Sequence, residues 1–277
     1  MILDGKLVKK LILEELREKV FELERKPGLA IILVGNNEAG EVYIRQKEKM
    51  ASYLGYVFEI LRFKDDVLQE DIISIIDELN NRDDIDGIMV QMPLPKHLDS
   101  ELIQNRIMAV KDVDGLSLEN VNRLKNKEKG LIPCTAIGVI DLLDYYNIDV
   151  FGKRVVIVGK SKLVGQPLYQ LFLQKGAEVL ICDSKTNNLS LITKQADILV
   201  VAVGKAKLIS REMIKSNAIV IDVGINLEDG KLVGDVDYEM VADKCYYITP
   251  VPGGVGPMTV AELGKNTYLA YLFRKNN

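Results

Sequence analysis

The sequence predicts an α/β protein of two domains: an N-terminal α/β domain, then a doubly wound parallel sheet, with a cleft between the two. Short runs rich in Val, Ile and Leu alternate along the chain with longer segments of helical periodicity, which is typical of parallel α/β architecture. The length of 277 residues exceeds what one ordinary core requires and suits two domains.

The first domain is predicted to span residues 1–118. Its end is placed there because residues 115–133 hold a charged stretch and then a proline that opens the next helical pattern. In chain order we expect a helix at 6–26, a strand at 29–34, a helix at 38–54, a strand at 57–63, a helix at 68–81 and a strand at 87–91.

The second domain is predicted to span residues 119–258, and the C-terminal helix, within 259–277, is expected to pack back on the first domain. The second-domain strands are continuously apolar, which indicates strands covered on both faces of a parallel sheet. An Asp229-Gly230 pair predicts a β-hairpin turn. The expected strands are 154–158, 178–182, 197–203, 218–223 and 245–248.

Composition excludes several classes of function. The 40 acidic and 36 basic side chains give a net charge of −4, without the basic footprint of a nucleic-acid binder. The N-terminus lacks the apolar core of a signal peptide, and no apolar run approaches the ~20 residues that span a bilayer. We therefore expect a cytoplasmic protein with no membrane contact. The three cysteines are scattered and His97 is the only histidine, so neither a metal site nor a Ser-His triad is expected.

A dinucleotide-binding turn is predicted after the strand at 154–158. Gly159-Lys160-Ser161 follows that strand, and Pro167 suits the first turn of the next helix. Backbone N–H groups at such a helix start point at a pyrophosphate in Rossmann-like sheets. The pattern G-x-S-x-x-x-G departs from G-x-G-x-x-G, so the interpretation depends on the strand–turn–helix context, and an ordinary strand-to-helix turn is the alternative.

The residues after the next strand leave the choice of dinucleotide open. Asp183 stands where an acid bonds the ribose 2′-hydroxyl and favours NAD. Lys160, Ser184 and Lys185 are suited instead to a 2′-phosphate, which favours NADP.

Four polar residues of the first domain are candidates for a reaction site. Tyr43 and Lys47 stand four apart on a predicted helix and project from one face. Gln91 ends an apolar strand, where α/β sheets place ligands, and Asp114 precedes Gly115 in a Lys-Asp-Val-Asp-Gly segment. Taken singly, these features are also typical of an exposed helix face, a strand end and a turn.

The order and spacing of several motifs identify a family. Over essentially its full length the chain resembles the FolD family of methylenetetrahydrofolate dehydrogenase/cyclohydrolases. The matching segments are Tyr43-Ile-Arg-Gln-Lys47, Gly87-Ile-Met-Val-Gln-Met-Pro-Leu-Pro95, Lys111-Asp-Val-Asp-Gly115, Pro133-Cys-Thr135, Gly159-Lys-Ser161, Val164-Gly-Gln-Pro167, Asp222-Val-Gly-Ile-Asn226 and Thr249-Pro-Val-Pro-Gly-Gly-Val-Gly-Pro-Met-Thr259.

The resemblance implies a role for each matching residue. Lys47 is then the central catalytic residue, with Tyr43 and Gln91 beside it, and Asp114 binds the pterin. The implied substrate-binding positions are Tyr43, Asp114, Pro252, Gly253 and Gly254, and the implied cofactor-binding positions are Gly159, Lys160, Ser161, Ser184 and Ile225.

The implied activity is oxidation of 5,10-methylenetetrahydrofolate by NADP, then hydrolysis of the methenyl product to 10-formyltetrahydrofolate, in a homodimer. The family's usual arginine is Lys160 here and its frequent histidine is Asp183, which leaves NAD possible. The alternatives are an NAD-dependent monofunctional dehydrogenase of this family, a generic Rossmann dehydrogenase that shares only the second half, and a folate- or nucleotide-binding regulator without turnover.

Hydrolysis requires proton transfer, for which the candidate is Lys47. The ordinary lysine pKa of about 10.4 is too high for a base at neutral pH, but burial and a neighbouring cation both lower it. We therefore expect Lys47 to work largely as a neutral amine, oriented by Gln91 and Tyr43.

Overall fold

The computed structural model describes residues 1–35 and 38–275, which fall into two compact lobes. We call them by their sheets. The three-stranded lobe comprises Leu11–Cys134 and Val260–Asn277, and the five-stranded lobe comprises Met1–Lys10 and Thr135–Thr259. The boundary that we expected at residue 118 stays a prediction.

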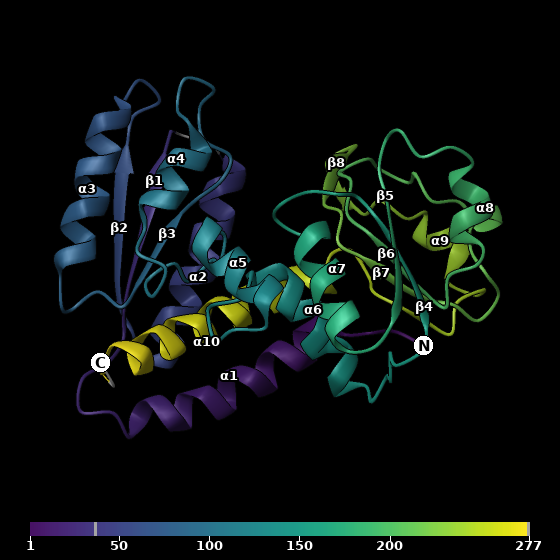
Figure 1. Ribbon diagram of the computed structural model, residues 1–277, viewed down its shortest axis with the longest axis horizontal. Coiled ribbons are helices and arrows are strands. Elements are labelled where there is room, and N and C mark those ends of the chain that lie inside the picture. The colour runs from purple at the N-terminus through teal and green to yellow at the C-terminus, as the bar shows by residue number, and fades with distance from the viewer. Residues whose placement is uncertain (36–37, 276–277) are drawn as a thin grey trace. The chain divides into compact units, whose positions relative to one another are not determined.

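The three-stranded lobe is a parallel sheet with helices on both faces (Figure 1). Its strand order is β2-β1-β3, with Gly28 paired to Val57 and Leu29 to Gly87. Its elements are α1 (Gly5–Phe21, shared with the other lobe), β1 (Gly28–Val34), α2 (Glu38–Leu54), β2 (Val57–Phe63), α3 (Gln69–Asn81), β3 (Gly87–Val90), α4 (Ser100–Arg106), α5 (Leu118–Asn126) and α10 (Val255–Lys275, also shared).

Strand β1 is buried at every position because successive side chains enter two different cores. Ala30 and Ile32 pack with the buried residues of α3 and α4. Leu29 and Ile31 pack in a second cluster with residues of α1, α2 and α10. Helix α2 is thereby fixed against one face of the sheet, beside β3.

The loop before α5 is tied by a buried carboxylate. Asp112 accepts hydrogen bonds from Gln104 Nε2 at 3.0 Å, from the N–H groups of Gly115 at 3.1 Å and Ser117 at 2.8 Å, and from Asn120 Nδ2 at 3.0 Å. A buried carboxylate with this many donors holds its loop in one conformation. The backbone of Asp114 lies inside that loop.

The five-stranded lobe is a parallel sheet of order β10-β7-β6-β4-β5, the doubly wound topology that the sequence predicted. Its elements are α6 (Cys134–Tyr145), β4 (Arg154–Val158), α7 (Gly165–Gln174), β5 (Glu178–Cys182), α8 (Leu189–Thr193), β6 (Ile198–Val201), the 3-10 helix η1 (Arg211–Met213), β7 (Ile219–Asp222), β8 (Asn226–Glu228), β9 (Lys231–Val233), α9 (Tyr238–Val241) and β10 (Tyr247–Ile248).

The predicted hairpin is confirmed as β8 and β9, with positive φ at both Asp229 and Gly230. The expectation of strands covered on both faces is wrong for β5, in which Leu180 is 48% exposed. The reason is position: β5 is an edge strand, so its outer part lacks the cover that β6 receives on all four residues.

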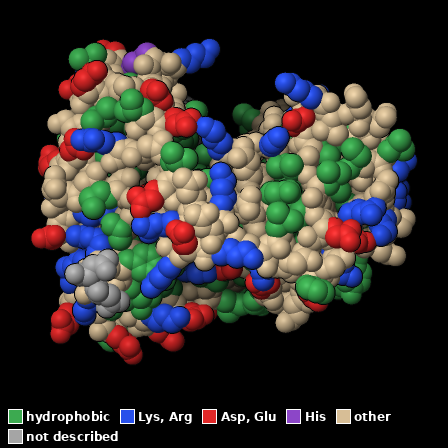
Figure 2. All heavy atoms as spheres, in the orientation of Figure 1, with side chains coloured by type: hydrophobic (Ala, Val, Ile, Leu, Met, Phe, Trp, Pro, Cys, Tyr) green, Lys and Arg blue, Asp and Glu red, His purple; other side chains and the backbone are tan. Residues whose placement is uncertain are grey.

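Charged side chains are spread over the face of the molecule that Figure 2 draws. Figure 2 shows Lys and Arg side chains lying among Asp and Glu side chains on the face in view. Across residues 1–35 and 38–275, no helix combines the length and the apolar character needed to cross a membrane.

Candidate active site

Lys47 lies on the buried face of α2. The apolar stripe of that helix contains Ile44, Met50, Ala51 and Leu54, each 2% exposed or less, and Lys47 occupies the same stripe at 6% exposure. A lysine is rarely this buried unless its amine has a defined environment. One core position of the three-stranded lobe is therefore occupied by an amine instead of an apolar side chain.

Two residues of β3 and its extension contact that amine. Lys47 Nζ lies 2.7 Å from Gln91 Oε1 and 3.1 Å from Met89 Sδ. The Gln91 amide is fixed at its other end, because Nε2 donates to Met92 O at 2.8 Å. This second bond determines which amide atom faces Lys47, so the amine meets an acceptor.

The environment disfavours charge on both ionisable groups of the site. Burial lowers the pKa of Lys47, and the attraction of Asp114 and then of Cys134 opposes this shift. Burial raises the pKa of Asp114 to about 6, and the nearby Lys47 opposes that shift. Desolvation thus makes the neutral fraction of Lys47 larger than that of a lysine in water. Asp114, with a pKa of about 6, remains mostly ionised near pH 7.

Tyr43 lies on the same helix as Lys47 but is less closely tied to the site. It is half-buried, and burial raises the pKa of its hydroxyl. Among the described residues no hydrogen bond joins it to Lys47 or Gln91. The structure thus brings Lys47, Gln91 and Asp114 together, with Tyr43 one helical turn away.

The turn after β4 has the backbone that a phosphate-binding loop requires. Gly159 has φ of 120°, and a Cβ there would lie 2.1 Å from Ala202 O. Ser161 Oγ accepts from the N–H groups of Val164 at 3.2 Å and Gly165 at 3.4 Å at the start of α7. Lys160 and Ser161 are themselves exposed, so the turn fits the phosphates of a dinucleotide.

The carboxylate of Asp183 is engaged by its own turn after β5. Its Oδ1 accepts from Lys185 N at 2.9 Å and from Thr186 Oγ1 at 3.4 Å. Ser184 and Lys185 are exposed beside it. This arrangement compensates part of the charge of Asp183 and presents a hydroxyl and an ammonium group, which suit a 2′-phosphate.

A buried carboxylate also fixes the segment that presents Ile225. Asp222 accepts from the N–H groups of Gly224, Asp235 and Val236 at 2.9–3.0 Å, and burial raises its pKa to about 6. Ile225, which directly follows Gly224, is 42% exposed. It is therefore an apolar surface held on a rigid turn.

The loop of Pro252, Gly253 and Gly254 is tied to the N-terminus. Gly253 O accepts from Gly5 N at 3.0 Å, and Gly254 N donates to Pro250 O at 2.8 Å. A Cβ on Gly5 would lie 1.8 Å from Gly254 O, so the approach of these two backbones depends on glycine. Pro252 is exposed at the tip.

Comparison with known proteins decides the family. Residues 3–114 match the family model described as "Tetrahydrofolate dehydrogenase/cyclohydrolase, catalytic domain". Residues 133–275 match the model described as "Tetrahydrofolate dehydrogenase/cyclohydrolase, NAD(P)-binding domain". The chain belongs to the tetrahydrofolate dehydrogenase/cyclohydrolase family.

Individual members of this family match over the whole chain. The bifunctional protein FolD of Vesicomyosocius okutanii subsp. Calyptogena okutanii is 50% identical over 271 residues, 98% of each chain. The crystal structure of the bifunctional FolD of Campylobacter jejuni aligns with a TM-score of 0.97 and 44% identity, over 99% of each chain. The Trypanosoma brucei FolD complexed with NADP cofactor and inhibitor aligns with a TM-score of 0.96 and 35% identity, over 100% of this chain and 99% of that one. The resemblance to FolD is thus confirmed.

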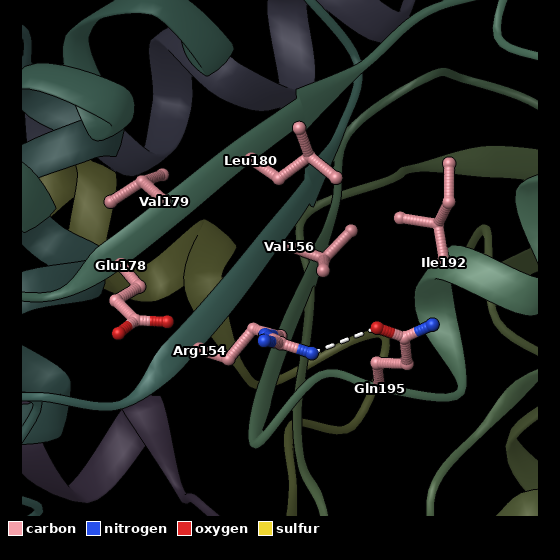
Figure 3. A pocket seen from close by; sticks show the side chains of 7 residues that line it. All are labelled: Arg154, Val156, Glu178, Val179, Leu180, Ile192 and Gln195. Atoms are coloured by element: carbon pink, nitrogen blue, oxygen red, sulfur yellow. Dashed lines mark hydrogen bonds between the residues drawn. The ribbon is translucent and has the colours of Figure 1, made fainter.

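A separate depression lies in the five-stranded lobe, away from the Gly159 turn. It has a volume of about 310 Å³ and is lined on the face of β4 and β5 by residues that include Arg154, Glu178 and Gln195. Figure 3 shows Arg154 reaching Gln195, at 2.8 Å. Arg154 and Glu178 are the first residues of their strands, whereas parallel sheets bind ligands beyond the last.

The part of the chain that the structure describes contains no group of three or more His, Cys, Asp or Glu side chains arranged to hold a metal ion. Sequence reasoning missed Met89 and Asp112. The signal for Met89 was its spacing, two residues before Gln91 on one strand, and Asp112 was present in a motif from which only Asp114 was chosen.

Proposed function

We propose that this protein oxidises 5,10-methylenetetrahydrofolate to the 5,10-methenyl form with NADP and then hydrolyses that product to 10-formyltetrahydrofolate. The main observation in support is the buried amine of Lys47, which is held 2.7 Å from Gln91 Oε1 in a site that disfavours its charged form. Membership of the family supports both activities, since its models and FolD relatives are named for them.

In the first reaction a C–H bond of the folate methylene bridge breaks and its electron pair leaves as hydride. NADP, when bound, accepts that hydride. The protein's contribution is to hold the folate and keep the newly cationic bridge from unfavourable neighbours. A neutral Lys47 serves this purpose, because an ammonium group would repel the cation that forms.

In the second reaction water attacks the cationic bridge carbon. A new C–O bond forms while a water proton passes to Lys47 Nζ, which is available as an acceptor because burial favours the neutral amine. One C–N bond of the folate ring then breaks as the new hydroxyl loses its proton and becomes the formyl carbonyl. The leaving nitrogen receives the proton held on Lys47 Nζ. Gln91 holds the amine throughout, through the 2.7 Å bond.

The remaining residues of the three-stranded lobe bind the substrate. Asp114 accepts two parallel hydrogen bonds from the amino group and ring N–H of the pterin, as an ionised carboxylate does. Tyr43 supplies a half-buried aromatic face, and the loop of Pro252, Gly253 and Gly254 supplies close backbone contact.

The cofactor is held by the five-stranded lobe. Gly159 and Ser161 would hold the pyrophosphate, and Ile225 would contact the nicotinamide. Lys160, Ser184 and Lys185 would bind the 2′-phosphate. Support for NADP comes from the exposed cations and hydroxyl at this turn and from the internal bonds of Asp183.

One experiment tests the proposal against its alternatives. Purified protein is mixed with methylenetetrahydrofolate and either NADP or NAD, and absorbance follows the reduced nucleotide and the methenyl intermediate. We expect NADPH to form with little accumulation of methenyl product. A monofunctional dehydrogenase would accumulate it, reduction of NAD alone would reverse the cofactor assignment, and a regulator would bind ligands without turnover.

The proposal includes a cytoplasmic homodimer that uses a small-molecule folate and neither nucleic acid nor membrane. Light scattering on the purified protein checks the assembly, with a mass of twice 31.0 kDa expected. A mass of 31.0 kDa at working concentration would contradict it.

A further inference from the structure

Strand β3 and the residue after it offer Lys47 two acceptors rather than one. Met89 and Gln91 are two residues apart in extended backbone, so both side chains point to the same side of the sheet. Met89 Sδ and Gln91 Oε1 lie 3.1 and 2.7 Å from the same Nζ atom. In the described part of the chain these are the hydrogen-bond partners of that amine.

The number of acceptors matches the neutral form of lysine. A neutral amine has two N–H donors and one lone pair, whereas an ammonium group has three donors and none. With both N–H groups directed at Met89 and Gln91, the third tetrahedral position of Nζ carries the lone pair. An ammonium group in the same place would have one donor without an acceptor among the described residues.

We propose that Met89 is a positioning residue for Lys47: its sulfur and the Gln91 oxygen together hold the two N–H groups and direct the nitrogen lone pair at the one-carbon bridge of the folate. This inference rests on the proposed function of Lys47 and adds the reason for its orientation. Met89 touches the amine and does not itself react.

Sulfur is suited to this task because it accepts weakly and carries no charge. A second carboxylate at that point would hold the amine but would also stabilise its ammonium form. Met89 is 7% exposed and belongs to the apolar cluster of β1, α2 and α10, so its sulfur is held in place by packing. The direction of the amine is thus fixed with little gain for the charged state.

The charged and titratable groups that face the amine from other elements are Asp114 and Cys134. Asp114 favours the ammonium form, and the Cys134 thiol remains neutral because burial raises its pKa. Tyr43 is the titratable neighbour on α2 itself, and burial raises its pKa also. Exchange of Met89 leaves all three in place, so an altered pH profile reports on the sulfur.

The test is Met89→Leu, a swap that conserves volume and removes the acceptor. We expect kcat for methenyltetrahydrofolate hydrolysis to fall about fivefold, as loss of one weak hydrogen bond would produce, with KM changed by less than about twofold. The acidic limb of the rate profile should move slightly to lower pH, because even the weak sulfur acceptor stabilises the ammonium form a little more than the amine. Met89→Gln restores an acceptor and should recover part of kcat.

Met50→Leu is the matched control, since Met50 is 2% exposed in the same cluster and lies on the same helix as Lys47. Wild-type kcat and an unmoved profile in Met89→Leu overturn the proposal, and so does an equal loss in Met50→Leu. If Met89→Leu does not fold, replacement of methionine by norleucine removes sulfur while keeping its shape, and the same fall is expected. Absence of turnover in the wild-type protein would instead refute the proposed function.

Discussion

The Nζ atom of Lys47 lies 2.7 Å from the Oε1 atom of Gln91, on the buried face of α2. An uncharged acceptor fixes the amine, while desolvation lowers its pKa. A group so placed gives up its own proton more readily than an exposed lysine, so it is better suited to accept one from water.

Replacement of Lys47 by Met should greatly slow hydrolysis of methenyltetrahydrofolate. The long apolar side chain fills the same core position but carries no proton acceptor, so we expect a fall of roughly 10²- to 10⁴-fold in kcat. The decay of methenyl absorbance measures this, corrected for the uncatalysed rate. Retained NADP binding and an unchanged unfolding temperature would show that the fold persists. Hydrolysis at the wild-type rate would refute the role of Lys47.

The pH profile of hydrolysis should respond to charge at position 91. The rate is expected to rise with pH as Lys47 loses its proton, at a pH below the ordinary lysine value because burial lowers its pKa. Gln91→Glu places a carboxylate beside the ammonium group, raises that pKa and moves the rise to higher pH. At pH 7 the variant should be slower, and the difference should shrink at higher pH. A profile superimposable on wild type would contradict the contact.

Asp114→Asn should weaken folate binding without affecting NADP. The amide keeps the shape but loses the charge and one of two acceptors, so we expect about a tenfold or larger rise in the folate dissociation constant. Wild-type affinity should also fall as pH drops through about 6, where Asp114 becomes protonated, and the variant should lack this dependence. Titrations of both ligands across pH 5–8 test it. Equal losses for folate and NADP would count against the assignment.

Removal of the cations near Asp183 should reduce the preference for NADP. Lys160→Ala or Lys185→Ala deletes a charged partner of the 2′-phosphate, and we expect KM for NADP to rise about tenfold while KM for NAD is unchanged. Lys194→Ala, an exposed lysine at the end of α8, serves as the control. If NAD and NADP were affected alike, the 2′-phosphate would have to bind elsewhere.

Most elements were predictable because their apolar patterns are long and end at clear signals. The strands at 57–63, 154–158 and 178–182 and the helix at 38–54 have the predicted bounds. The helix expected at 6–26 ends at Phe21. There the Lys26 ammonium group folds back and donates to the carbonyls of Val20, Phe21 and Leu23, a cap that periodicity does not reveal.

Long-range contacts explain what the sequence left open. The strand expected at 197–203 stops at Val201, because the N–H of Val203 bonds to the carboxylate of Asp235, far along the chain. The spacing of Tyr43 and Lys47 suggested an exposed pair, whereas Lys47 shares the buried stripe with Ile44. Only the pairing of β3 beside β1 brings Met89 and Gln91 under that stripe.

The assembly of each lobe from distant segments has a consequence for biosynthesis. Leu29 of β1 shares its core with Val260 and Ala261 of α10, and Ile2 pairs with Ile248 of β10. The apolar surfaces of these early segments are therefore fully covered only after β10 and α10 have been synthesised. Nascent chains that stall before α10 should leave the core around Leu29 covered only in part, by α1 and α2, and should depend on chaperones for solubility.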